Sequence, residues 1–373
     1  MDMTVNLNPD DAHLAPLPLV GESNLESVAL LKQVAQAHRY LAELKGVAKA
    51  IPNEAILIST LSMQEAKDSS AIENIFTTHD QLFQSQVLGG HQINQATKEV
   101  ENYRRALWES YQKTAASGLI RLNDILATQE VVEPNKPGLR KIPGTVTGNA
   151  STGQVIYTPP QHPDDIQSLM ANLVEYINDD ALSDLDPLIK MAIIHHQFES
   201  IHPFYDGNGR TGRILNILYL VKNQLLDLPI LYLSRYIVET KDDYYRLLQS
   251  VREQGEWAEW VSYIVKGIEV TAKETIDFVH QMRDLIMLTK QRMRTELPKM
   301  YSQELLNNLF FHPYTKVQFV VDQLGVTRIT ATKYLEALTE KGFVSKHKVG
   351  RNNYYINEPL VELIVRQEGE YAS

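Results

Sequence analysis

The stretch "HPFYDGNGRTGR", residues 202–213, decides how this chain is read, because it places a histidine, an acid, three glycines and two arginines within twelve positions. Its second half, from Gly207 to Gly212, fits the dinucleotide-binding pattern G-x-G-x-x-G. That pattern requires a buried strand before its first glycine and an acid about 20 residues later. Here "IHPFYD" precedes the glycine, and the next acid, Asp227, follows a long apolar helical stretch. The context therefore excludes a Rossmann loop.

The same residues are typical of a phosphate site at the start of a helix. A helix that begins near Gly209 presents unpaired N–H groups in its first turn, and Gly207 lets a phosphate approach that backbone closely. Asn208 can donate to the same anion. Arg210 and Arg213 are three positions apart, so they share one helical face and can bind further phosphates.

Two further residues supply chemistry to this site. Asp206 offers a hard carboxylate that suits Mg²⁺, whose coordination phosphate oxygens and water would complete. A helix-capping role for Asp206 would coexist with that function. His202 can take a proton near neutral pH. The stretch therefore predicts a nucleoside-triphosphate site with a general base.

The stretch also resembles the signature of the Fic family, H-[PF]-[FL]-x-[DE]-G-N-G-R-x-x-R, at every specified position. Most members transfer AMP from ATP to a hydroxyl side chain of a protein, whereas Doc-type kinases of the same fold depart at the glycines and the last arginine. The resemblance implies that His202 is the base and that Asp206 holds Mg²⁺. It implies an ATP site in this loop formed by His202, Gly207, Asn208, Gly209, Arg210, Thr211, Gly212 and Arg213.

The resemblance extends to a β-hairpin at 141–158, which looks like the flap that aligns a target segment as an added strand. It implies that Ile156 and Tyr157 lie near the nucleotide. "DDYYRLL" resembles the element on the adenine side, so that Tyr244 and Tyr245 are candidates for stacking on the base. Packing alone would also explain this tyrosine pair.

"SSAIEN", residues 69–74, matches the inhibitory motif [ST]-x-x-x-E-[GN], with Ser69, Glu73 and Asn74 in place. In such proteins the glutamate pairs with the second arginine of the loop, here Arg213, and keeps the γ-phosphate out of its productive position. Glu73 would thus border the ATP site and inhibit it. An ordinary surface helix is the alternative, because a six-residue pattern recurs by chance.

The expected fold class is mainly α: a Fic-type helical core with a β-hairpin flap, followed by a C-terminal winged helix-turn-helix. Apolar periodicity predicts helices over 186–202, with Pro187 in the first turn, and over 210–226. The expected domains are an N-terminal helical region 1–110 with the motif 69–74, a catalytic core 111–270, a connecting helix 271–300 and a winged-helix domain 301–373.

The C-terminal segment differs from the rest of the chain in charge. Residues 301–356 hold seven Lys or Arg and four Asp or Glu, a net charge of +3, in a chain of −10. A second helix from about Thr327 and two short strands around Gly350 would present a phosphate-contacting face. Its candidate residues are Arg328, Thr330, Thr332, Lys333, Lys346, Lys348 and Arg351. DNA contact, protein docking and homodimer formation all stay open for this segment.

Composition narrows the remaining possibilities. The absence of cysteine excludes disulfides and thiolate metal sites, and the net charge of −10 disfavours a general nucleic-acid or membrane binder. The acidic, polar N-terminus and the lack of a long apolar run favour the cytoplasm. His195 and His196 could suggest a metal site with Glu199, but no H-E-x-x-H occurs. They are expected to line the core or the site.

Two classes of function remain after this reading. One is a Mg²⁺-dependent protein adenylyltransferase that uses ATP, modifies a target protein or itself, and is inhibited by Glu73. The other is a winged-helix DNA-binding regulator whose Fic core senses nucleotide. His202 favours the enzyme, because nucleotide binding alone does not need a base. An enzyme that removes AMP with the same site is a variant of the first class.

Overall fold

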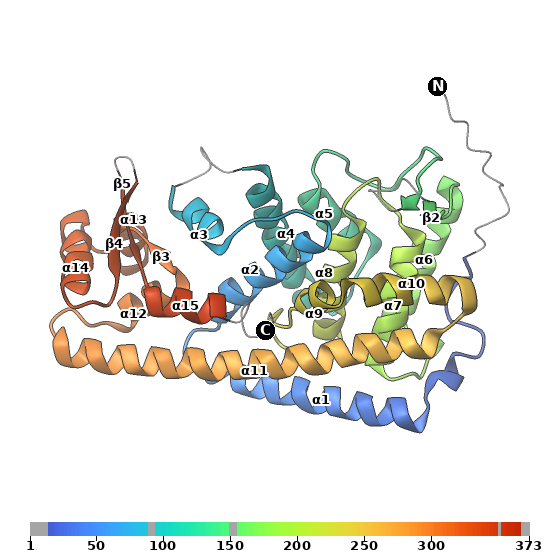
Figure 1. Ribbon diagram of the computed structural model, residues 1–373, viewed down its shortest axis with the longest axis horizontal. Coiled ribbons are helices and arrows are strands. Elements are labelled where there is room, and N and C mark those ends of the chain that lie inside the picture. Colours follow the sequence, from blue (N-terminus) through green and yellow to red (C-terminus); the bar gives the residue numbers. More distant parts are fainter. Residues whose placement is uncertain (1–13, 89–93, 149–154, 350–351, 367–373) are drawn as a thin grey trace. The chain divides into compact units, whose positions relative to one another are not determined.

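The computed structural model describes residues 14–88, 94–148, 155–349 and 352–366, and the fold is mainly α, as predicted (Figure 1). The chain forms two compact units. Unit 1 takes the chain up to Leu41, Asn102–Pro229 and Leu233–Val270. Unit 2 takes Ala42–Glu101, Ile230–Tyr232 and the chain from Thr271. Three of the five boundaries fall inside helices, which are α1 (Val28–Ala48), α4 (Gln95–Ser117) and α11 (Trp257–Glu296).

Unit 1 is built around two buried helices, α7 and α8, that pack against each other. Its helices are α5 (Leu122–Val132), α6 (Pro163–Asn178), α7 (Pro187–Ile201), α8 (Asn208–Lys222), α9 (Ser234–Glu239) and α10 (Lys241–Gln254). In α7 every residue after Pro187 is buried, so this helix is the centre of the unit. Asp186 caps α7, because its side chain accepts from the Leu188 N–H at 2.8 Å, and Pro187 supplies the fixed φ of a first helical residue.

The expected hairpin is present as a short antiparallel pair, β1 (Thr147–Gly148) and β2 (Val155–Tyr157). Its tip, 149–154, lies outside the described residues. The pairing is shorter than the expected 141–158 because its flanks bond elsewhere. The Gly144 N–H donates to the Gln161 side chain at 2.7 Å, and Pro159 and Pro160 have no N–H to add to a strand.

Unit 2 joins an N-terminal helical segment to the C-terminal segment. Its elements are α2 (Glu54–Ile72), α3 (His79–Leu88), α12 (Gln303–Phe311), β3 (Tyr314–Thr315), α13 (Val317–Leu324), α14 (Arg328–Glu340), β4 (Ser345–Val349), β5 (Asn352–Ile356) and α15 (Glu358–Arg366). The strands pair antiparallel in the order β3-β5-β4, and α13 and α14 meet at a turn whose Gly325 has φ 66°. A helix-turn-helix followed by a hairpin is the element order of a winged helix. Gly350 and Arg351 lie outside the described residues.

In the part of the chain that the structure describes, no helix combines the length and the apolar character that crossing a membrane requires.

Candidate active site

The loop between α7 and α8 carries the residues of the sequence motif. His202 caps α7 in the left-handed conformation, with φ 48° and ψ 57°, and its N–H donates to the Phe198 carbonyl at 3.0 Å. Gly207 caps the start of α8, also left-handed, with φ 80°. Two left-handed residues therefore reverse the chain between two buried helices. The imidazole of His202 stands, partly exposed, at one end of this loop.

The side chain of Asn208 stabilises the loop by hydrogen bonds to its backbone. Its side-chain oxygen accepts from the Phe204 N–H at 2.8 Å, and its side-chain nitrogen donates to the Phe204 carbonyl at 2.8 Å. The amide group is therefore engaged within the loop. The first turn of α8, Asn208–Arg210, offers main-chain N–H groups of the kind that bind anions at a helix N-terminus.

Four charged side chains meet beside this turn. Arg210, whose side chain is only 3 % exposed, places Nη2 3.5 Å from Asp206 Oδ1 and 3.6 Å from Glu133 Oε2. Lys136 Nζ lies 3.5 Å from Asp206 Oδ2. Asp206 Oδ1 also accepts from the Gly207 N–H at 2.7 Å. Two carboxylates thus hold one buried guanidinium, and the Asp206 carboxylate stays accessible to solvent.

Asp206 suits Mg²⁺ as a single protein ligand. Its carboxylate is 46 % exposed, so water and phosphate oxygens can reach the same ion. Among the described residues no group of three or more His, Asp or Glu forms a cage for a metal. A cation here would depend on the bound phosphates for most of its ligands.

Gly212 on α8 packs directly against α7. A Cβ atom at this position would stand 2.7 Å from Glu199 Oε1 and 3.0 Å from Phe198 Cδ1. The neighbouring Thr211 and Arg213 are buried as well. Gly209 is partly exposed at the loop end of the helix. Gly212 therefore allows close packing of α8 on α7, while Gly209 lies at the partly exposed start of the helix.

The flap residues Ile156 and Tyr157 lie against helices of the same unit. Tyr157 Oη donates to the Ser200 carbonyl at 2.9 Å, and the Arg252 guanidinium carbon lies 3.9 Å from the Tyr157 ring centroid. Burial raises the pKa of Tyr157, and Arg252 opposes that rise. Ile156 is half-exposed, and its carbonyl accepts from Gln249 at 3.2 Å. The structure thus brings Tyr157 to the end of α7, two residues from His202.

Tyr244 and Tyr245 occupy different environments. Tyr244 is buried, and its Oη lies 2.9 Å from His195 Nε2. Tyr245 is 43 % exposed and meets Tyr244 edge to face, with ring centroids 5.2 Å apart. Only the Tyr245 ring is therefore open enough for a base to stack on it.

His195 and His196 lie in an aromatic cluster with Tyr244, Trp257 and Trp260. Burial lowers the pKa of each to about 3, assisted by the charge of Arg213 for His195 and of Arg252 for His196. Both are therefore neutral core residues at physiological pH.

The residues of the inhibitory motif lie in unit 2, at the end of α2. Ser69 is buried, while Glu73 caps the helix with its N–H on the Ser70 carbonyl at 3.0 Å and has an exposed side chain. Asn74 follows with φ 61°, a conformation that Asn and Gly tolerate. Because Arg213 belongs to unit 1, the pairing of Glu73 with Arg213 stays a prediction.

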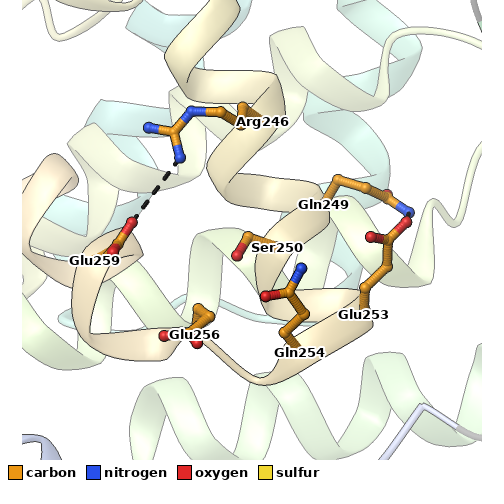
Figure 2. A pocket seen from close by; sticks show the side chains of 7 residues that line it. All are labelled: Arg246, Gln249, Ser250, Glu253, Gln254, Glu256 and Glu259. Carbon is orange, nitrogen blue, oxygen red and sulfur yellow. Dashed lines mark hydrogen bonds and ion pairs between the residues drawn. The ribbon is translucent and has the colours of Figure 1, made fainter.

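A surface pocket of unit 1 lies on α10 and the start of α11 (Figure 2). Three glutamates line it with Arg246, which lies 3.9 Å from Glu259, and with Gln249, which also contacts the flap. None of the residues of the motif loop lines this pocket.

Sequence reasoning did not identify Glu133, Lys136 or Arg140 as part of this region. Glu133 and Lys136 contact the loop residues Arg210 and Asp206. Arg140 donates from Nε to the His202 carbonyl at 2.7 Å. None of the three belongs to a local pattern, because each is about 60 to 80 residues from its partner.

Known proteins resemble this chain in sequence at both of its ends. Residues 31–112 match the model of the Fic/DOC family N-terminal region, and residues 285–360 match the model "Protein adenylyltransferase SoFic-like, C-terminal domain". A protein adenylyltransferase of Caenorhabditis elegans is 28% identical over 172 residues, 45% of this chain and 32% of that protein. A probable protein adenylyltransferase of Aquifex aeolicus is 29% identical over 181 residues, 48% of this chain and 53% of that protein. The chain thus spans about a third to a half of these curated relatives.

The fold is similar to that of solved Fic proteins. A Fic family protein of Desulfovibrio desulfuricans superposes with a TM-score of 0.56 at 21% identity, covering 92% of this chain and 98% of that one. A fragment of Fic-1 of C. elegans superposes with a TM-score of 0.54 at 22% identity, covering 68% and 73%. Together with the complete loop motif between α7 and α8, these matches show that the chain is similar to Fic proteins in the sequence of two of its segments and in its fold.

Proposed function

We propose that the protein is a protein adenylyltransferase, which moves AMP from ATP to a Ser, Thr or Tyr hydroxyl of a target protein or of itself. The observation that supports this most directly is the loop geometry: a partly exposed His202 stands at the end of α7, and the N-terminus of α8 follows six residues later. One short loop thus holds a proton acceptor and an anion site.

In the proposed reaction the target's hydroxyl oxygen bonds to the α-phosphorus, and the bond from that phosphorus to the pyrophosphate oxygen breaks. His202 takes the hydroxyl proton. The first turn of α8 and the arginines Arg210 and Arg213 would bind the β- and γ-phosphates, with pyrophosphate as the leaving group. Mg²⁺ on Asp206 would neutralise phosphate charge when bound. Ile156, Tyr157, Thr211, Gly212 and Tyr245 complete the proposed ATP site, whereas the buried Tyr244 would support the Tyr245 ring from behind.

We further propose that Glu73 inhibits this activity by pairing with Arg213, with Ser69 and Asn74 fixing the end of α2. The names of the similar proteins support transfer of AMP rather than the DNA-binding regulator or AMP removal. A homodimer, a DNA contact through residues 301–373 and a cytoplasmic location remain proposals. For DNA, the support is the exposure of Arg328 and Lys333 on α14 and of Lys348 on β4.

The test of the activity uses labelled ATP, cell lysate and two chains, the natural one and His202→Ala. We expect His202→Ala to lose AMP transfer by about 10²- to 10⁴-fold, the worth of a positioned general base, with ATP affinity nearly unchanged. Incorporation of label and binding of ATP are measured on the same preparations. Near-normal transfer by His202→Ala would reject the assignment.

A further inference from the structure

The carbonyl groups at the C-terminal end of a helix have no partners within it. In α7 these are the carbonyls of residues 199–202, next to the proposed base. Each of the four accepts a hydrogen bond from a side chain elsewhere in unit 1. The bonds are Arg252 Nη2 to Glu199 O at 3.2 Å, Tyr157 Oη to Ser200 O at 2.9 Å, Arg140 Nη2 to Ile201 O at 3.2 Å and Arg140 Nε to His202 O at 2.7 Å. We call these three side chains the carbonyl cap.

Arg140 is the buried centre of the carbonyl cap. Its residue is 1% exposed, and its Nη2 also donates to the Pro160 carbonyl at the far end of the flap. Its own N–H donates to the Pro203 carbonyl at 2.9 Å, and Leu139 forms a β-bridge with Phe204. The main chain and the side chain of Arg140 therefore form hydrogen bonds with the residues on both sides of His202.

The left-handed backbone conformation of His202 depends on these hydrogen bonds. A residue with a Cβ enters the left-handed region only at a cost, so the surroundings must hold it there. Charge-assisted bonds to the carbonyls of Ile201 and His202 fix the peptide units that precede and follow the strained Cα of His202. A cation at the C-terminal end of α7 is also favoured by the helix dipole.

The carbonyl cap also joins the flap to α7. Tyr157 ends β2, and Arg252 covers its ring while its Nε lies 3.1 Å from Ser200 Oγ. Arg140, before β1, and Tyr157, at the end of β2, therefore both bond the end of α7, and Arg140 also bonds the Pro160 carbonyl after β2.

We propose that Arg140 is a positioning residue for His202: its guanidinium holds the His202 backbone left-handed and thereby sets where the imidazole stands, with Tyr157 and Arg252 completing the cap. The role of the imidazole as base rests on the proposed function. The positioning of the imidazole does not.

The experiment compares the natural chain with Arg140→Met, Arg140→Lys and a control, Lys190→Met. Lys190 is a buried cation at the other end of α7, with Nζ 3.4 Å from Asp180 Oδ1, so its loss also removes a buried charge but not near His202. Two properties are measured: the imidazole NMR signals of His202, assigned by their absence in His202→Ala, and the kcat and KM for ATP.

For Arg140→Met we expect displaced His202 signals and a kcat lower by about 10- to 100-fold, with KM for ATP within about twofold, because the base is misplaced while ATP still binds. Arg140→Lys should shift the same signals less, since an ammonium keeps a charged donor near these carbonyls but lacks the planar fork of the guanidinium. If Arg140→Met does not fold, Arg140→Lys decides. Lys190→Met should lower the unfolding midpoint but leave His202 in place.

Unchanged His202 signals in both Arg140 variants, or an equal displacement by Lys190→Met, would overturn the positioning role. A different result would reject the proposed function alone. If the Arg140 variants displace the His202 signals but no chain transfers AMP, not even the natural one, the positioning role is supported and the transfer of AMP is not.

Discussion

At the scale of single residues, Gly212 sets the distance between α7 and α8. The first of its neighbours is a carboxylate oxygen of Glu199, 2.7 Å from where a Cβ would lie, and the second is the Phe198 ring. We expect Gly212→Ala to lower the free energy of unfolding by about 1–3 kcal/mol, the usual cost of overpacking a core. Urea unfolding of the full chain measures it.

The matched control for Gly212→Ala is Gly46→Ala, in α1. A Cβ at Gly46 would meet no atom within 4 Å, so this change should stabilise the helix by up to about 1 kcal/mol. Equal effects of the two substitutions would show that close packing at Gly212 does not matter.

A pairing of Glu73 with Arg213 would limit AMP transfer. If Glu73 occupies the guanidinium that the γ-phosphate needs, Glu73→Gly should raise AMP transfer by about 10- to 100-fold, because ATP can then bind in its productive position. Adding Arg213→Ala should remove that gain. Label incorporation by the single and double variants measures both effects, and an unchanged Glu73→Gly would make 69–74 an ordinary helix end.

At the scale of elements, α7 makes the fold sensitive to acid. His195 and His196 have pKa values lowered to about 3, whereas the unfolded chain would titrate them near 6.5. Below about pH 6.5 the unfolded state therefore binds more protons than the folded state, and stability falls as the pH falls.

We expect the free energy of unfolding to drop by up to about 1.4 kcal/mol per pH unit for each of these two histidines, between about pH 6 and pH 3. His196→Gln should remove the contribution of one histidine from the slope of the free energy of unfolding against pH. Urea unfolding at a series of pH values gives both slopes, and parallel curves for the natural chain and His196→Gln would contradict the expectation.

The elements that could be predicted are those with a pattern in their own stretch of sequence. A continuous apolar run with Pro187 at its start gave α7, and the spacing of glycines gave the turn into α8. The capping of α7 by Arg140 and Arg252 had no such signal, because orphan carbonyls find partners through packing and not through sequence neighbours. For the same reason the motif did not reveal that the Asn208 amide bonds the Phe204 backbone.

At the scale of the whole molecule, the C-terminal segment and the helix of the inhibitory motif belong to one unit. The contacts within it are specific. The Gln64 side chain on α2 donates to the Ile364 carbonyl at 3.3 Å, and Lys316 Nζ donates to the Val87 carbonyl at 2.6 Å. Tyr314 Oη donates to Asp80 Oδ1 at 2.6 Å, and burial together with Asp80 raises the pKa of this tyrosine.

Because α2 is buried on most of its surface and packs against α12, residues 301–373 are part of what holds it folded. We expect a chain that ends at residue 300 to lose hydrogen-exchange protection in α2 and α3, while α7 and α8, which belong to unit 1, keep theirs. Tyr314→Phe in the full chain is the milder probe. Losing one hydrogen bond of about 1 kcal/mol should speed exchange in α3 about fivefold.

Tyr301→Phe is the matched control. The Tyr301 hydroxyl donates to the Gln303 side chain at 3.4 Å, a hydrogen bond that lies inside the C-terminal segment. It should leave exchange in α3 unchanged. If Glu73 inhibits from the end of α2, the shortened chain should also transfer AMP faster, as Glu73→Gly does, because the inhibitory residue loses the helix that presents it. Full protection of α2 in the shortened chain would mean that this helix is held by other contacts, and the winged helix would then have no part in setting the inhibitory motif.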